Sequence, residues 1–231
     1  MSTEIVIVSC SAHPESEAEN LLLYRSCLDG VANTEVHLDL TCNNREGLPV
    51  VYNRKLMQYA NSDAEFLVFT HDDVYIDDLK LAKKLRHAHR DLGFEIIGLA
   101  GASKIFPNQH ALWHLMSERQ HQHGVVAHFL KEGMVHSSSY GTTPARVAIA
   151  DGLFLAVHLP SVVKAGWRFN ENYRFHHYDI ASCLDALVLG LSIGVCPIHV
   201  IHKSLGLGPD KQGEWEASNA QFLAEYGTQF R

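Results

Sequence analysis

The sequence has no hydrophobic run long enough to cross a membrane, since no stretch approaches roughly 18 consecutive apolar residues. Its N-terminus also lacks the basic and then apolar pattern that precedes the cleavage site of a secretory signal. We therefore expect a chain without a transmembrane segment and with a cytoplasmic location.

Cysteine and positive charge are also scarce. The 231 residues include five scattered cysteines with no CxxC spacing, which is typical of a reducing compartment rather than of a disulfide framework. The formal net charge of −7 argues against general binding to nucleic acid. What is present, 46% hydrophobic and 19% charged residues, suits one large α/β domain.

Short apolar runs alternate with amphipathic segments in the first hundred residues. This alternation predicts βαβ units and a mainly parallel sheet flanked by helices. The strands are expected at 5–8, 35–39, 66–69 and 95–99, and the helices at 16–28, 50–59 and 77–92, the last with Leu79, Leu81, Leu85 and Ala88 facing inward.

The middle of the chain changes character. Residues 101–144 are rich in His, Gly, Ser and Asn, which predicts long loops with a few antiparallel strands. Regular structure is expected again at 147–157, in a helix at 178–189, in a strand at 192–201 and in a helix at 214–226. No repeat or linker divides the chain, so we expect one domain.

The strongest local signal is a buried strand that ends in His71, Asp72 and Asp73. In open α/β sheets, ligands bind just beyond the carboxyl ends of such strands. Two adjacent carboxylates repel each other, and a bound divalent cation relieves this repulsion. Mg²⁺ or Mn²⁺ held by Asp73 would commonly bridge to phosphates. The alternative is a solvated turn or a helix cap, and His71 either contacts a nucleotide or fills the strand end.

Two further polar residues stand at element boundaries. Asp179 precedes an apolar helix, where it is either a general base or an N-cap. His202 ends the last predicted strand, where it is either a nitrogen ligand for the same cation or a structural residue.

Weaker candidates lie at Asp39, Asn53 and the pair Asp151 and Gly152. Asp39 ends the second predicted strand and would contact a base or ribose, or belong to a turn. Asn53 would reach phosphates or face solvent. Gly152 would let the backbone approach a sugar closely, or form a bulge.

A histidine-rich segment runs from His110 to His128 and includes His114 and Trp113. Its spacings would suit zinc, but no cysteine or glutamate completes a recognisable pattern. Trp113 would stack on a sugar or belong to the core.

The order of these signals resembles the family 2 glycosyltransferases with the GT-A fold, and most closely the small bacterial domains named after a streptomycin biosynthesis protein. The resemblance extends from Ile5 to about Gly206 and is strongest over 47–74 and 169–206. It follows the series Ser9-Cys10-Ser11, Asp39, Asn53-Arg54, His71-Asp72-Asp73, Asp151-Gly152, Tyr178-Asp179 and Ile201-His202. One difference is that His71 replaces the first acid of the family's D-x-D motif. Another is that Ala181 and Asp185 stand where relatives often carry an acid and an arginine.

The resemblance implies a nucleotide-binding half at 1–100 and an acceptor and metal-completing half at 101–231. It implies roles for the candidate residues as well. Ser9 and Asp39 would hold the nucleoside, Asn53 would lie beside the nucleotide sugar, and His71 and Asp72 would occupy the D-x-D position with Asp73 as metal ligand. His202 would be the second metal ligand, Asp151 and Gly152 would lie near the donor sugar and acceptor, and Asp179 would be the catalytic base.

These expectations predict an inverting glycosyltransferase that depends on Mn²⁺ or Mg²⁺. It would move a sugar from a nucleotide-sugar donor, a UDP- or dTDP-sugar, to a hydroxyl of a glycan or small-molecule acceptor. Two alternatives are an inactive nucleotide-sugar-binding partner protein and a metal-dependent hydrolase of nucleotide sugars.

Overall fold

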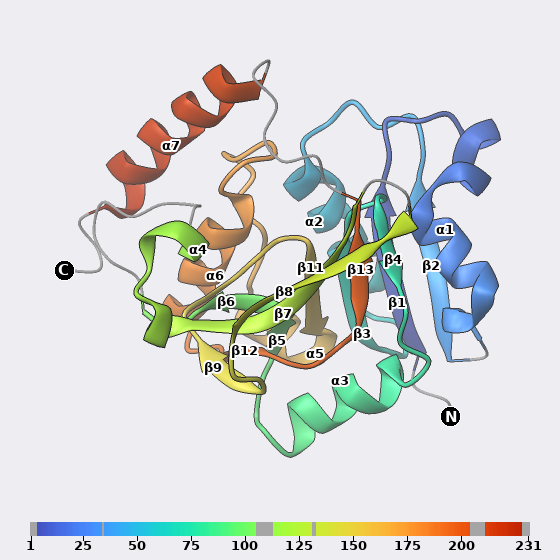
Figure 1. The fold of residues 1–231 in the computed structure, drawn as a ribbon, viewed down its shortest axis with the longest axis horizontal. Helices are drawn as coiled ribbons and strands as arrows, with labels where there is room; N and C mark the ends of the chain where they lie inside the picture. Colours follow the sequence, from blue (N-terminus) through green and yellow to red (C-terminus); the bar gives the residue numbers. More distant parts are fainter. Residues whose placement is uncertain (1–3, 34, 105–112, 131–132, 204–210, 228–231) are drawn as a thin grey trace.

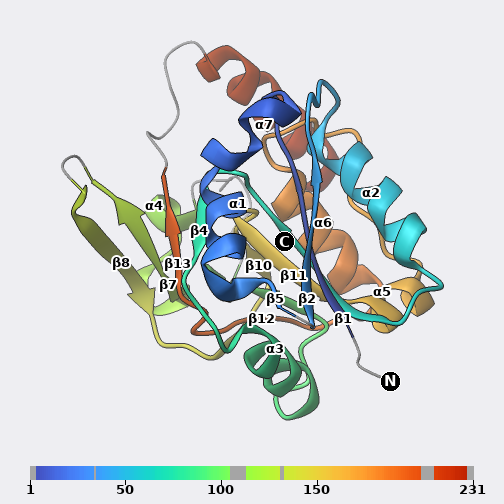
Figure 2. The same cartoon turned by 90° about the vertical axis from the view of Figure 1, so that its right-hand side faces the viewer.

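A computed structural model describes residues 4–33, 35–104, 113–130, 133–203 and 211–227. His110 and the glycines at 206 and 208 lie outside the described residues. Two sheets lie next to each other, and helices cover the larger one (Figures 1 and 2).

The larger sheet has seven strands in the order β2-β1-β3-β11-β5-β12-β9. The strands are β1 (Glu4–Cys10), β2 (Val36–Thr41), β3 (Ala64–Thr70), β5 (Ile96–Gly98), β9 (Ala145–Val147), β11 (Phe154–His158) and β12 (Ile193–Val195). The pairs β1–β2, β1–β3 and β5–β12 are parallel, whereas β11 is antiparallel to β3 and β5, and β9 to β12. The sheet is therefore mixed, with only β11 and β9 running against the others.

The smaller sheet has six strands in the order β10-β6-β7-β13-β4, and β8 also pairs with β7. The strands are β4 (Val74–Ile76), β6 (Ala100–Ala102), β7 (Gln122–Phe129), β8 (Val135–Gly141), β10 (Ile149–Ala150) and β13 (Val200–His202). Its strands β7, β8 and β13 lie on the side of the molecule away from helix α2 (Leu48–Tyr59), as Figure 2 shows. The antiparallel strands expected within 101–144 are confirmed as β7 and β8.

The remaining helices are α1 (Leu22–Ser26), α3 (Leu81–Arg90), α4 (Trp113–Met116), α5 (Leu159–Ala165), α6 (Tyr178–Val188) and α7 (Gln212–Tyr226). Short 3₁₀ helices occur at η1 (Glu15–Asn20) and η3 (Arg119–His121), and a π-helical turn occurs at η2 (Cys27–Val31). The expected helix at 16–28 is wrong as one element. Leu21 has an extended backbone that separates η1 from α1, and Gly30 has a φ of 122° inside η2.

Two other expectations need correction. The strand expected at 192–201 is split between the two sheets, because Pro197 interrupts it and has no N–H to donate to a ladder. Helix α3 begins at Leu81 instead of Asp77, so Leu79 lies outside the helix and is 75% exposed. The inward positions of Leu81, Leu85 and Ala88 are confirmed.

The core is centred on strands β1, β3 and β11, which are almost fully buried. Tyr52 of α2 packs its ring against Phe69 and Phe169, with centroids 4.8 and 5.2 Å away. Because β1 and β3 are parallel, the segments that follow them emerge at the same edge of the sheet. This edge carries the polar residues of the candidate site.

Candidate functional site

His71, Asp73 and His202 come together although they are far apart in the sequence. His71 directly follows β3, Asp73 lies in the turn before β4, and His202 ends β13. The pairing of β4 with β13 places His202 opposite Val74, and the N–H of Lys203 donates to the carbonyl oxygen of Asp73 at 3.0 Å. The ladder thus fixes one histidine beside the acidic turn.

The three side chains form a group suited to a metal ion. One ligand atom from each lies within 4.8 Å of the others, and Nε2 of His202 is 3.4 Å from Oδ2 of Asp73. Nε2 of His71 and Oδ1 of Asp73 are buried and have no hydrogen-bond partner. Since buried polar atoms normally have partners, these two fit the donor atoms of a cation site.

The protonation states also suit a cation. Burial lowers the pKa of His71, which keeps its imidazole neutral and able to donate a lone pair. Burial, the largest single effect, would raise the pKa of the Asp73 carboxyl, but the hydrogen bond with His202 opposes burial and the pKa is lowered overall. Two imidazoles and one carboxylate suit first-row transition ions such as Mn²⁺ better than Mg²⁺, which prefers oxygen ligands.

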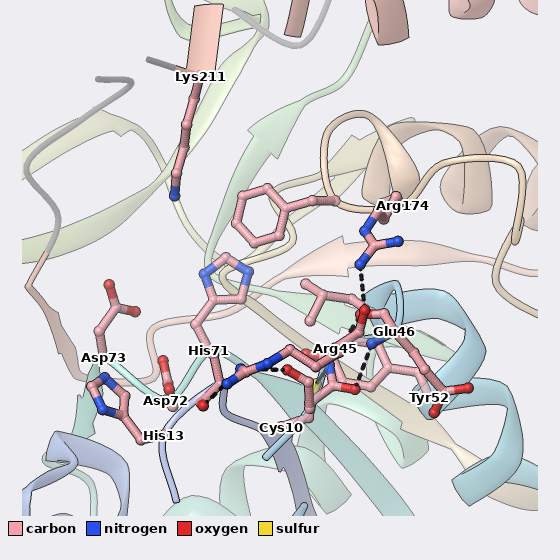
Figure 3. A pocket seen from close by; sticks show the side chains of 14 residues that line it. Cys10, His13, Arg45, Glu46, Tyr52, His71, Asp72, Asp73, Arg174 and Lys211 are labelled. Atoms are coloured by element: carbon pink, nitrogen blue, oxygen red, sulfur yellow. Dashed lines mark hydrogen bonds between the residues drawn. The ribbon is translucent and has the colours of Figure 1, made fainter. Parts of the chain in front are cut away.

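A cavity of about 470 Å³, the largest of those found among the described residues, opens beside this group. His71, Asp72 and Asp73 line one side of it, and Arg174 and Lys211 approach from the other, as Figure 3 shows. Arg45 also lines it, with its guanidinium donating to the carbonyl of Ala12 at 2.8 Å. Three cationic side chains near a candidate metal site form a surface that suits a diphosphate.

Asp179 lines a second cavity of about 210 Å³, which shares His71 and Phe175 with the first. It lies in the first turn of α6, and His177, with a φ of 66°, occupies the N-cap position. The N-cap interpretation of Asp179 is therefore wrong. The arrangement leaves its carboxylate at the cavity, next to the wall that carries the candidate metal ligand His71.

Gly152 holds Asp179 in place. Its N–H donates to Oδ2 of Asp179 at 2.8 Å, and its carbonyl accepts from the hydroxyl of Tyr178 at 2.9 Å. A Cβ atom at Gly152 would lie 2.6 Å from that hydroxyl and 2.8 Å from Cβ of Asp179. The glycine thus permits a close approach of the backbone to the start of α6.

The Asp179 carboxyl has the protonation behaviour of a general base. Burial, together with the nearby negative charge of Asp151, raises its pKa to about 7. Asp151 lines the same cavity and accepts a hydrogen bond from the N–H of Leu153 at 3.0 Å. A carboxylate that titrates near neutral pH can accept a proton from a hydroxyl.

The structure does not bring Ser9, Asp39 or Asn53 to these cavities. The Ser9 hydroxyl is buried and donates to the carbonyl of Thr70 at 2.8 Å. Asp39 forms an ion pair with Lys55 at 2.7 Å and accepts from the Tyr59 hydroxyl.

The Asn53 side chain is buried and hydrogen-bonded to Phe169 and Glu171. Its amide donates to the carbonyl of Phe169 at 2.9 Å and to Glu171 at 2.8 Å, and its oxygen accepts from the N–H of Phe169 at 2.9 Å. Buried and fully engaged, it fastens α2 to the segment that leads to Arg174 and Phe175.

The sequence did not single out Arg45, Arg174, Phe175 or Lys211. All four lie outside strands, and tertiary contacts bring them together. The N–H of Leu48 donates to the carbonyl of Arg174 at 2.9 Å, and the ammonium of Lys211 lies 5.7 Å from the centre of the Phe175 ring. For Arg45, Arg174 and Lys211, the only sequence signal was positive charge in turn-rich segments.

Among the described residues, His71, Asp73 and His202 form the one cluster with metal-ligand geometry. The described part of the histidine-rich segment holds no such group. Nor does any helix in the described ranges combine the length and the apolar character needed to span a membrane.

Comparison with known proteins assigns the chain to a family. The model of a family described as "Glycosyltransferase like family" matches residues 15–226, so the chain belongs to this family. No curated protein matches the sequence. Among solved structures, the chain is similar to A197 from STIV, with 10% identity, a TM-score of 0.49, and coverage of 84% of this chain and 82% of that one.

Family membership supports glycosyl transfer as the role of the protein, and with it a nucleotide-sugar donor and an acceptor. The mixed α/β architecture with parallel strands is consistent with a glycosyltransferase-like fold.

Proposed function

We propose that the protein is an inverting, metal-dependent glycosyltransferase with a GT-A arrangement, in which one domain spans the chain. The donor is a UDP- or dTDP-sugar whose diphosphate lies in the largest cavity, between the acidic turn and the side chains of Arg45, Arg174 and Lys211. Arginine forks and a lysine point charge are the groups that proteins use to hold phosphate oxygens.

The proposed cation site consists of His71, Asp73 and His202, and Mn²⁺ is favoured over Mg²⁺ because two of the three donors are imidazole nitrogens. When bound, the cation would neutralise charge on the diphosphate leaving group. His71 supplies a third ligand where D-x-D families carry an acid, and its neutral state at pH 7 follows from its burial.

Asp179 is the proposed base, and one observation carries this proposal. Its carboxylate lines a cavity whose wall includes His71, a member of the cation group. The Gly152 N–H holds one carboxylate oxygen, and the carboxylate at the cavity would accept the proton of an acceptor hydroxyl. General base catalysis of this kind contributes ~10²–10⁴-fold.

A turnover assay tests the proposal. The purified protein is incubated with UDP- and dTDP-sugars, Mn²⁺ and a panel of glycosides, and released nucleoside diphosphate and product anomeric configuration are measured. Release that requires acceptor, with inversion at the anomeric carbon, is expected. Release in water alone would instead indicate a hydrolase.

The variant Asp179→Asn should lose transfer by at least ~10²-fold while binding nucleotide normally. The matched control is Asp63→Asn, which changes an exposed residue in the turn before β3. Normal turnover by Asp179→Asn would remove Asp179 from the mechanism.

A further inference from the structure

Strand β8 forms an open edge of the smaller sheet. One side of β8 pairs with β7 along its whole length, and no described strand pairs with the other side. In Figure 2, β8 lies at the outer rim of the molecule, on the side away from α2. The backbone groups on the outer side of β8 can therefore pair with a further strand, as at any open sheet edge.

The ladder between β7 and β8 identifies residues whose backbone points outward. The N–H of Leu130 donates to the carbonyl oxygen of Met134 at 2.7 Å where the two strands approach the hairpin end. Hydrogen-bonded and non-hydrogen-bonded positions alternate along an antiparallel pair. Val135 and Ser137, one and three residues further along, therefore occupy non-hydrogen-bonded positions, and their N–H and C=O groups point away from β7.

The strands at the other ends of the two sheets are short or charged. β2 contains Asp39 and β9 contains Arg146, whereas β4 has three residues and β10 has two. Short length and charged side chains are two ways in which proteins prevent an edge from pairing with another chain. β8 has neither protection, because it has seven residues and contains no Asp, Glu, Lys, Arg or Pro. An unprotected edge of this length is typical of a strand that has a partner.

Apolar side chains beside this edge are exposed to solvent. Met134 and Val135 are 58% and 47% exposed, and Leu130, which is bonded to Met134 across the hairpin, is 49% exposed. These side chains lie at the start of β8, next to the outward-pointing backbone of Val135 and Ser137. A strand that pairs there would cover part of this apolar surface, so that hydrophobic burial would add to the backbone hydrogen bonds.

The chemistry of the edge favours a second copy of this chain over a charged partner. Copies of a chain with a net charge of −7 repel each other where acidic groups meet, but β8 brings no charge to the contact. The strand also has no charged group that would select an acidic or a basic peptide. Two identical antiparallel strands are related by a twofold axis, so every contact is made twice. The small side chains of Ser137 and Ser138 lie near the middle of the strand and let two copies approach closely.

We propose that two copies of the chain associate through antiparallel pairing of β8 with its equivalent, which joins the two smaller sheets into one continuous sheet. Arg119 donates to the carbonyl oxygen of Ser139 at 2.6 Å, so the pairing is centred before this residue, over Val135 to Ser138. The dimer is independent of the proposed function, because β8 contributes no side chain to the cation group or to the two cavities described above.

Analytical ultracentrifugation over a range of protein concentrations tests the dimer. The parent should sediment as a monomer–dimer equilibrium. Ser137→Lys places a like charge on both copies beside the twofold axis, so it should raise the dissociation constant at least about tenfold. Ser137 is exposed, and circular dichroism should show that the variant keeps the parent's fold. The matched control Ser16→Lys adds the same charge at an exposed serine of η1 and should associate as the parent does.

Charge reversal distinguishes pairing of the two strands from a general effect of the substitution. Ser137→Glu should also dissociate when it is alone, for the same reason as Ser137→Lys. An equimolar mixture of the two variants should recover a dimer with one copy of each, because opposite charges then meet across the twofold axis.

A parent that stays monomeric at every concentration would overturn the proposal and would leave the edge of β8 to a strand of another protein. A parent dimer that Ser137→Lys leaves intact would also overturn it, because the contact between copies would then lie on another surface. A mixture of the two charged variants that stays monomeric would show that position 137 does not face its equivalent.

Discussion

Nε2 of His202 lies 3.4 Å from Oδ2 of Asp73, and the two residues come from opposite halves of the chain. The β4–β13 ladder joins them, since it pairs Val74 with His202. The candidate cation site is therefore fixed by backbone pairing and not only by side-chain packing, and its ligands can be tested one at a time.

Replacing Asp73 should abolish the effect of metal on nucleotide binding. Asp73→Ala removes the only carboxylate of the group, so the affinity for UDP should become the same with and without Mn²⁺. Calorimetry at fixed ionic strength measures this. Asp72→Ala is the matched control, because Asp72 lines the cavity but lies outside the cation group. If the parent protein bound UDP equally well with and without Mn²⁺, that result would count against the proposed cation site.

Replacing His71 by aspartate should change which ion is preferred. The parent should bind Mn²⁺ at least about tenfold more tightly than Mg²⁺, and His71→Asp should narrow this difference because oxygen replaces an imidazole nitrogen. Mn²⁺ paramagnetic resonance with Mg²⁺ competition reports the ratio without nucleotide. The control is His87→Gln, which changes an exposed histidine of α3 outside the cation group. An unchanged ratio in His71→Asp would exclude His71 as a ligand.

Transfer should depend on pH through Asp179. Burial and the charge of Asp151 raise its pKa to about 7, so activity should rise with pH through that value as the carboxyl ionises. Asp151→Asn removes the repelling charge, which lowers this pKa and moves the acidic limb of the kcat/KM profile to lower pH. If the acidic limb of the kcat/KM profile were at the same pH in Asp151→Asn as in the parent, ionisation of Asp179 would not control transfer.

Adding a methyl group at Gly152 should impair catalysis more than binding. The new Cβ would lie 2.6 Å from the Tyr178 hydroxyl and 2.8 Å from Asp179, so Asp179 must move. Loss of its position should lower kcat by roughly 10²-fold and leave UDP affinity unchanged. Gly213→Ala is the control, because a Cβ there meets nothing within 4 Å. Equal kcat values for the two variants would show that this contact does not matter.

Asn53 should contribute to stability and not to nucleotide binding. Asn53→Ala leaves the N–H and carbonyl of Phe169 without partners in a buried position, which should cost about 2 kcal/mol in the free energy of unfolding. Urea denaturation measures the loss, and UDP titration of the folded variant should give the parent's affinity. A large drop in the UDP affinity of the folded variant would show that Asn53 contributes to nucleotide binding.

Much of the fold could be predicted because buried strands have a strong sequence signature. The apolar run of β3 predicted a fully buried strand, and the residues after it line the largest cavity. The residues after Val195 could not be read correctly, since an apolar run continues across Pro197 while the chain changes sheets. Periodicity reports burial but not which sheet a strand joins.

The candidate site was only partly predictable, for a related reason. Asp73, Asp179 and His202 follow or begin regular elements, where sequence patterns are informative. Arg45 and Arg174 depend on loops that meet only in the folded chain, where the guanidinium of Arg174 donates to the carbonyl of Arg45. The expectation that Asp39 ends a strand is wrong, because β2 continues to Thr41, and the Asp39 carboxylate is paired with Lys55.

His202 belongs to the proposed cation group and also lines a cavity of about 260 Å³ next to Trp113 and Tyr140. Thermodynamic reciprocity then requires that any ligand of this cavity which tightens the binding of manganese be itself bound more tightly in the presence of manganese, by the same factor.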